Sequence, residues 1–160
     1  MKTIYNILDE LGIEYVKHEH PAVFTCEESE AVGYRRAEGG NTKNLFLRNK
    51  KGTRHYLVSL GHEKQADLKT LKEKLGESNL SFASAERLME YLGLTPGSVS
   101  LLGLVNNAAH DVIVILDEDL WKNNVICCHP NINTSTLDIK REDMEKFFKW
   151  CGNEVRVMEL

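Results

Sequence analysis

The sequence lacks most of the signatures that assign a function directly. No apolar run approaches the length of about 18 residues that a membrane-spanning helix needs, and no basic and then apolar segment opens the chain. We therefore expect neither a membrane span nor a secretory signal. No P-loop and no GxGxxG motif is present, which argues against a phosphate loop or a dinucleotide-binding turn. No G-x-S-x-G elbow surrounds any serine, so a serine triad is unsupported.

Cysteine is sparse, with four residues and no CxxC pair: Cys26, Cys127, Cys128 and Cys151. This usage predicts reduced, packed thiols in a cytoplasmic protein. Only Cys26, at the start of an expected helix, could be an exposed nucleophile, and packing is the better interpretation there too. The pair His18 and His20 has no third ligand at metal spacing, so we expect no metal and no cofactor.

The composition is that of an ordinary globular protein, with 42% hydrophobic and 28% charged residues in a chain of 160. This length predicts one domain that spans residues 1–160. Apolar spacing, capping residues and glycine stops predict helices at 4–11, 25–33, 68–75, 85–92 and 144–151, and strands at 13–17, 43–48, 54–60, 112–116, 125–128, 134–139 and 154–158.

This order of elements is not a regular βαβ alternation, so the predicted fold class is α/β with a mixed, curved, barrel-like sheet surrounded by helices. The runs at 112–116 and 125–128 are continuously apolar. We therefore expect both to be central strands that are covered on both faces.

One stretch of the chain is strongly basic although the whole chain has a net charge of −4. Between Arg35 and Arg54 the sequence has one acid, Glu38, and seven basic residues: Arg35, Arg36, Lys43, Arg48, Lys50, Lys51 and Arg54. Such a basic strip favours binding of a polyanion, with an affinity that falls as salt rises. The alternative is a solvated flank of a lysine-rich hairpin.

Three places could carry chemistry. Lys43 follows two glycines at the start of a strand, where its point charge suits a phosphate, or it is simply an exposed strand-end lysine. Pro96-Gly97 predicts a turn, which could also aim backbone N–H groups at an oxyanion. His129 ends an apolar strand beside Pro130, where it either faces a pocket or is a structurally hydrogen-bonded histidine.

Four blocks in order give the chain a resemblance to the YbaK/ProX group of trans-editing deacylases, relatives of the insertion domain of bacterial prolyl-tRNA synthetase. The four blocks are His20-Pro21-Ala22-Val23-Phe24-Thr25, Lys43-Asn44-Leu45-Phe46-Leu47, Leu94-Thr95-Pro96-Gly97-Ser98-Val99 and His129-Pro130-Asn131-Ile132-Asn133-Thr134. The segment from Leu104 to Asn107 and the strand after it resemble the ProX side. The Gly-rich Ser-Pro segment of the cysteinyl-tRNA-editing branch is not found.

This resemblance implies an enzyme with the fold of that insertion domain, which hydrolyses the ester between a wrong amino acid, here alanine, and the 3′ adenosine of proline tRNA. It implies catalytic roles for Lys43, Gly97 and His129, and substrate contacts by Thr25, Asn44, Phe46, Ser98 and Asn133. The basic residues Arg35, Arg36, Arg48, Lys50, Lys51 and Arg54 would hold the tRNA. One departure is Leu101, where the family often has proline.

Family resemblance further suggests that a bound water attacks the ester, without a covalent nucleophile or a cofactor. The expected partner is tRNA rather than DNA or a membrane, and recruitment by prolyl-tRNA synthetase is left open. Two alternatives also stay open at this point: the same enzyme type acting on cysteinyl-tRNA, and a non-catalytic tRNA-binding module that kept the fold.

Overall fold

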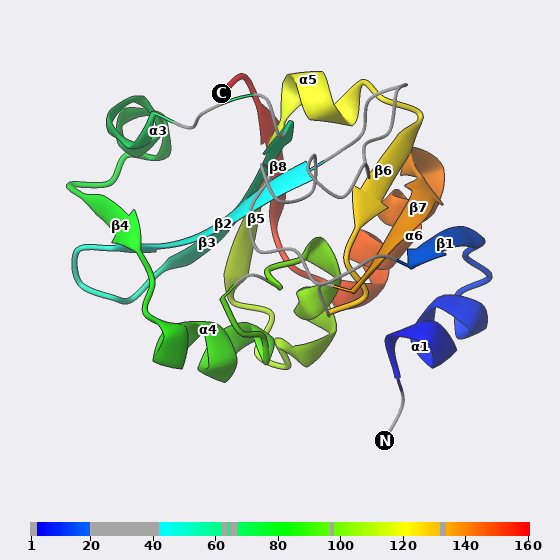
Figure 1. Ribbon diagram of the computed structural model, residues 1–160. Coiled ribbons are helices and arrows are strands. Elements are labelled where there is room, and N and C mark those ends of the chain that lie inside the picture. Colours follow the sequence, from blue (N-terminus) through cyan, green and yellow to red (C-terminus); the bar gives the residue numbers. More distant parts are fainter. Residues whose placement is uncertain (1–2, 20–41, 62–63, 65–66, 97, 132–133) are drawn as a thin grey trace.

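Two open sheets and the helices around them form the described part of the molecule (Figure 1). In the computed structural model, residues 3–19, 42–61, 64, 67–96, 98–131 and 134–160 are described. The larger sheet has the order β4-β2-β3-β5-β8 and the smaller one the order β1-β7-β6. The strands are β1 Tyr15–Glu19, β2 Thr42–Asn49, β3 His55–Gly61, β4 Leu80–Phe82, β5 Val112–Asp117, β6 Val125–Cys128, β7 Ser135–Lys140 and β8 Val155–Met158.

The helices begin and end at residues with ordinary capping chemistry. They are α1 Ile4–Glu10, α3 Leu68–Leu75, α4 Ala85–Leu92, the short 3₁₀ helix η1 Leu101–Asn106, α5 Glu118–Trp121 and α6 Arg141–Cys151. Asp67 and Ser84 cap the first turns of α3 and α4 with their side chains. Gly76, Gly93 and Gly152 close α3, α4 and α6 in the left-handed conformation. The glycine stops expected for these three helices are therefore confirmed, whereas β4, η1 and α5 were not expected.

The larger sheet is mixed, as expected, because β2 pairs antiparallel with β3 while β3, β5 and β8 run parallel. Val112, Val114 and Leu116 of β5 face a large core cluster that α4, η1 and α6 help to build. Ile115 of the same strand faces a second cluster, which α3 covers. Both faces of β5 are therefore buried, which explains its continuous apolar run and confirms that it is a central strand.

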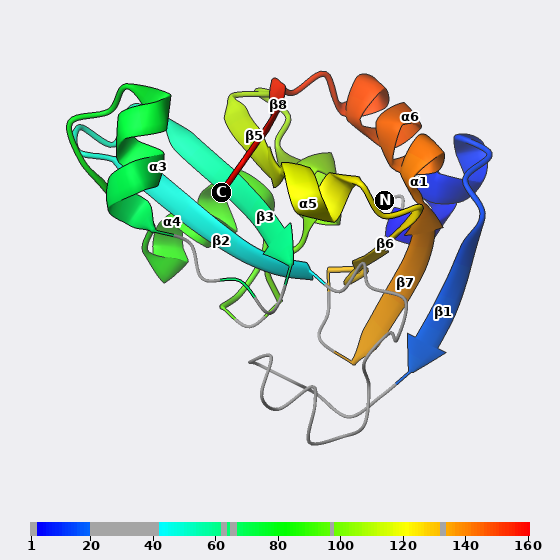
Figure 2. The same ribbon diagram turned by 90° about the horizontal axis from the view of Figure 1, so that it is seen from above.

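The arrangement of the strands differs from the expectation in two ways. The described strands form two open sheets, so the expected single curved, barrel-like sheet is not what the structure shows. In addition, β6 is an edge strand among the described strands, because the order of the smaller sheet is β1-β7-β6. Ile126, Cys127 and Cys128 of β6 are nevertheless buried, and α6 packs against β6 and β7 (Figure 2). Burial of both faces therefore does not require a central position.

The described residues include neither a membrane-spanning helix nor a cluster of metal ligands. No helix there combines the length and the apolar character needed to cross a membrane. Nor do the described residues contain a group of three or more His, Cys, Asp or Glu side chains that could hold a metal ion. The expected helix at 25–33 lies outside the described residues.

Candidate active site

The start of β2 places Lys43 and Asn44 beside the smaller sheet (Figure 1). In the antiparallel pairing with β3, Lys43 lies opposite Leu60 and Asn44 lies opposite Ser59. Lys43 and Asn44 are both half-buried, whereas Ser59 is completely buried. Side chains alternate along a strand, so these two neighbours point to opposite faces of the larger sheet.

The Asn44 side chain connects two parts of the chain by hydrogen bonds. Its Nδ2 donates to the Val99 carbonyl at 3.3 Å, and its Oδ1 accepts from the Ser59 hydroxyl at 2.8 Å. A carbonyl can only accept, so this contact fixes the orientation of the amide, and the Ser59 hydroxyl is then the donor. Asn44 therefore holds the segment that follows the Pro96-Gly97 turn against β2.

The same segment is also attached to the end of β6. The Ser98 amide donates to the Thr95 carbonyl at 3.0 Å, which confirms the expected turn. The Ser100 hydroxyl caps η1 by accepting from the Leu102 amide at 3.1 Å, and it donates to the His129 carbonyl at 2.6 Å. Three of the four sequence blocks are thus joined by side-chain hydrogen bonds that meet at residues 98–100, which we call the central loop.

His129 is fixed through its backbone and through its ring. Its Nδ1 lies 3.1 Å from the Ser135 carbonyl at the start of β7. Because that oxygen only accepts, Nδ1 carries the proton, and the acceptor lone pair of the neutral ring is on Nε2. The histidine is therefore held by hydrogen bonds through its ring and through its carbonyl, which fits the interpretation as a structurally hydrogen-bonded histidine.

Asn131, two residues further on, has two unusual features. Its φ of 66° lies in the left-handed region, which asparagine tolerates better than most residues. Its Oδ1 is buried and has no hydrogen-bond partner among the residues that the structure describes. A buried acceptor without a partner costs free energy, so it is a candidate for binding a donor from a substrate.

The other expected site residues are placed as follows. Phe46 is 5% exposed and packs in the large core cluster, where its ring stacks on His55 with centroids 5.5 Å apart. Ser98 is buried in the central loop. Leu101, where the family often has proline, is the first residue of η1. Proline is well tolerated at that position, and leucine there fills the core instead. Thr25, Gly97 and Asn133 lie outside the described residues.

The basic strip is not one compact patch. Lys43 is at one end of β2, while Lys50 and Lys51 form the hairpin turn at the other end (Figure 1). Lys50 is seven positions after Lys43 in extended chain, which corresponds to roughly 23 Å. Arg54 follows the turn and pairs with Glu77 at 3.3 Å, and Arg48 lies just before it. Arg35 and Arg36 lie outside the described residues.

Buried thiols in the structure do not have the properties of nucleophiles. Burial raises the pKa of Cys128 to about 12 and that of Cys151 to about 12. Both groups are therefore neutral thiols at physiological pH. Cys127 is also buried, and its Sγ donates to Asp138 at 3.2 Å. The expectation of packed thiols is confirmed for these three residues, and Cys26 lies outside the described residues.

Sequence reasoning missed Ser59, Ser100 and Asn131 as parts of the site. A signal existed for the two serines, because each is a lone hydroxyl among apolar residues of a strand or at the start of an apolar helix. Their partners, however, are 15 and 29 residues away in the sequence. Only the pairing of β2 with β3 and the path of the central loop bring these groups together.

Comparison with known proteins supports the resemblance inferred from the sequence. A family model described as aminoacyl-tRNA editing domain matches residues 20–147. The prolyl-tRNA editing protein ProX of Acetoanaerobium sticklandii is 43% identical over 96% of this chain and 93% of its own length. Prolyl-tRNA synthetase associated domain-containing protein 1 of Danio rerio is 35% identical over 92% of this chain and 80% of its own length.

Solved structures show the same fold. A candidate trans-editing enzyme for prolyl-tRNA synthetase superposes with a TM-score of 0.67 at 23% identity, covering 96% of this chain and 92% of that one. The hypothetical protein APE2540 superposes with a TM-score of 0.72 at 16% identity, covering 96% and 97%. The chain therefore belongs to the aminoacyl-tRNA editing domain family and is an aminoacyl-tRNA deacylase of the YbaK/ProX type.

Proposed function

We propose that this chain hydrolyses the ester that joins a wrongly attached amino acid, alanine above all, to the 3′ adenosine of proline tRNA. The 43% identity to a protein named prolyl-tRNA editing protein ProX supports proline tRNA as the substrate. The observation that carries the site is the double attachment of the central loop, through Asn44 to β2 and through Ser100 to His129. These contacts bring the Lys43-Asn44 block and the His129 block to the same loop.

Lys43 supplies a positive charge at the start of β2 for the phosphate next to the terminal adenosine. An ammonium group is a compact point charge that suits a single phosphate. Lys43 adjoins Asn44, so the strand that carries the charge is the strand to which the central loop is attached. Because the Lys43 side chain leaves β2 on the face opposite to that of Asn44, the 3′ end of the tRNA would cross the start of the strand to bring its ester to the loop backbone.

The Gly97 segment stabilises the negative charge that develops on the ester carbonyl oxygen. Backbone N–H groups in a fixed turn are effective donors to such an oxyanion. Support comes from the residues on either side, because the turn bond from Ser98 to Thr95 and the bond from Asn44 to Val99 restrain the neighbouring backbone. His129 lines the amino-acid pocket at the end of β6.

A water molecule attacks the ester carbonyl, and the ribose hydroxyl beside the ester helps to position it. The products are the free amino acid and the 3′ hydroxyl of the tRNA, to which the water proton is finally delivered. An aminoacyl ester is already activated, so orientation and oxyanion stabilisation suffice without a covalent intermediate. The raised thiol pKa values of Cys128 and Cys151 and the hydrogen-bonded hydroxyls of Ser59 and Ser100 agree with this mechanism.

Selection of alanine is mainly steric. A pocket that is too small for the proline ring rejects correctly charged tRNA, whereas the loss of one methylene changes binding by only about 1–3 kcal/mol. Proline is therefore excluded strongly. Cysteine, which is only slightly larger than alanine, is the competitor that a hydrophobic pocket discriminates least.

Proline tRNA charged in parallel with alanine, cysteine or proline tests this proposal, with chelator present and no synthetase in the assay. We expect rapid, chelator-insensitive loss of alanine, a slower loss of cysteine and the slowest loss of proline. Rapid loss of cysteine alone would assign the chain to the cysteinyl branch. No turnover with any of the three, together with salt-sensitive tRNA binding, would contradict the proposal and identify a non-catalytic binding module.

A further inference from the structure

Two arginine side chains converge at the hairpin turn between β2 and β3, far from Lys43. One is Arg48 at the end of β2, and the other is Arg87 of α4, which the sequence did not single out. A Cβ atom on Gly52 would lie 3.1 Å from Nη2 of Arg48 and 2.9 Å from Nη2 of Arg87. These two nitrogens are therefore no more than about 6 Å apart, and glycine at position 52 leaves the space that they share.

Backbone carbonyls of the turn hold both guanidinium groups. Arg48 donates from Nε to the Asn49 carbonyl at 3.2 Å and from Nη2 to the Lys50 carbonyl at 3.1 Å. Arg87 donates from Nη1 to the Gly52 carbonyl at 3.4 Å. A guanidinium has five N–H donors, so each arginine keeps several donors beyond these contacts. The two planar groups are thus positioned before any ligand arrives.

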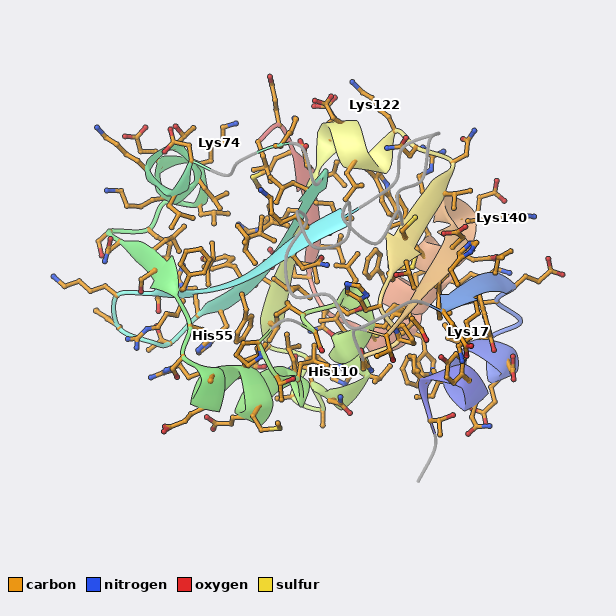
Figure 3. The ribbon with its side chains drawn as sticks, viewed as in Figure 1. Lys17, His55, Lys74, His110, Lys122 and Lys140 are labelled. Atoms are coloured by element: carbon orange, nitrogen blue, oxygen red, sulfur yellow. The ribbon has the colours of Figure 1, made fainter. Side chains whose placement is uncertain are left out.

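His55 completes the support of Arg87 from the interior of the sheet. Its Nε2 lies 3.1 Å from Nη1 of Arg87, and because arginine can only donate, this nitrogen is the acceptor of a neutral ring. The imidazole of His55, labelled in Figure 3, is buried and contacts the rings of both Phe46 and Tyr91, at centroid distances of 5.5 Å and 4.0 Å. The position of Arg87 is therefore set by a packed aromatic group, not by a flexible surface partner.

The charge of this pair is not neutralised within the described part of the chain. No ion pair there joins Arg48 or Arg87 to a carboxylate, although Glu77 pairs with the nearby Arg54. Glu90 and Asp111 act on His55 only as through-space charges, and Lys50 and Lys51 are exposed on the same turn. Two like charges held this close repel each other, so the arrangement is favourable when an anion lies between them.

We propose that Arg48 and Arg87 form a binding site for a backbone phosphate in the acceptor stem of the tRNA. Fixed guanidinium forks match the tetrahedral oxygens of a phosphate and read no base sequence. Arg48 lies five residues from Lys43 along β2, which is roughly 17 Å of extended chain. This separation excludes the phosphate next to the terminal adenosine, so the contact is made further down the stem. This inference rests on the proposed function for the identity of the RNA.

Binding of uncharged proline tRNA to Arg87→Gln and Arg48→Gln, over a series of salt concentrations, tests the site. The salt slope is the steepness with which the logarithm of the binding constant falls as the logarithm of the salt concentration rises. Loss of one phosphate contact should lower this slope by about 0.7 to 0.9 and weaken binding about eightfold near 0.1 M salt. Arg156→Gln on β8 is the matched control, because it removes an arginine that pairs with Glu154 on the other edge of the sheet. We expect its binding and salt slope to equal those of the unaltered protein.

Hydrolysis of 3′-alanyl-adenosine separates this inference from the proposed function. This compound has no stem, so the effect of Arg87→Gln should be confined to substrates that carry one. An unaltered salt slope in both arginine variants would overturn the site. Equal losses on tRNA and on alanyl-adenosine would also overturn it, because Arg87 would then act on the fold or the active site. If the unaltered protein cleaves neither substrate, the proposed function fails, while the binding arm still tests the arginine pair.

Discussion

Ser59→Ala is the sharpest test of how the site is held together. The substitution removes the hydroxyl that donates to Oδ1 of Asn44 at 2.8 Å, inside a strand position that is completely buried. The amide oxygen of Asn44 then lacks its partner. Leaving such a group unsatisfied lowers the free energy of unfolding by about 1.5 kcal/mol, which corresponds to a fall in Tm of about 3 to 6 °C for a chain of this size.

The effect on activity should be larger than the effect on stability. The Asn44 side chain also donates to the Val99 carbonyl. Without the Ser59 hydroxyl this side-chain amide can rotate, which loosens the central loop beside Gly97. A displacement of about 1 Å in a catalytic loop can slow a reaction by up to about a hundredfold. We expect single-turnover deacylation to slow by at least about tenfold, whereas the Kd for uncharged tRNA stays unchanged because the basic residues are intact.

A double-mutant cycle assigns these effects to the contact itself. Ser59→Ala should cost less in an Asn44→Ala background than in the unaltered protein, with a difference of about 0.5 to 1.5 kcal/mol in urea unfolding. Ser81→Ala on β4 is the matched control, because that hydroxyl is exposed. Additive losses in the cycle, or a Ser59→Ala variant with unaltered stability and rate, would refute the assigned role of Asn44.

Two other predictions follow from the buried polar groups. Burial and the neighbouring Arg87 lower the pKa of His55 from its usual 6.5. His55 therefore binds a proton more readily in the unfolded chain than in the folded protein. Stability should therefore be lost as pH falls below about 6.5, and His55→Gln should show a weaker loss in pH-dependent urea unfolding; equal pH dependences would contradict this. Asn131→Gly should keep the fold, since glycine accepts a φ of 66°, but raise KM at least about fivefold if Oδ1 binds the substrate. An unaltered KM would make Asn131 a purely structural residue.

The sequence predicted correctly those elements that are determined by a short stretch of the chain. The apolar run of β5 indicated a strand buried on both faces, and the helix stops at Gly76, Gly93 and Gly152 depend only on backbone conformation. The edge position of β6 was not predictable in this way. It depends on β7 inserting beside β1, a pairing between segments about 120 residues apart.

The site was predicted in part for the same reason. The sequence singled out Lys43 and His129 because those residues suggest phosphate and pocket chemistry, and Asn44 through the family resemblance; their roles in the reaction stay predictions. The attachment of the central loop was missed because Ser59 and Ser100 acquire their roles from strand register and loop path. Proximity in sequence also misled for the basic strip, because an extended strand carries Lys43 and Lys50 far apart.

The central claim is that Lys43 acts in hydrolysis at the start of β2. Its most direct test is the single-turnover deacylation of alanyl-tRNA(Pro) by Lys43→Ala, with Lys69→Ala as a matched control on the exposed side of α3. We expect Lys43→Ala to lose at least about a hundredfold in rate with its Tm unchanged, and Lys69→Ala to match the unaltered protein. Hydrolysis by Lys43→Ala at the rate of the unaltered protein would contradict this active site.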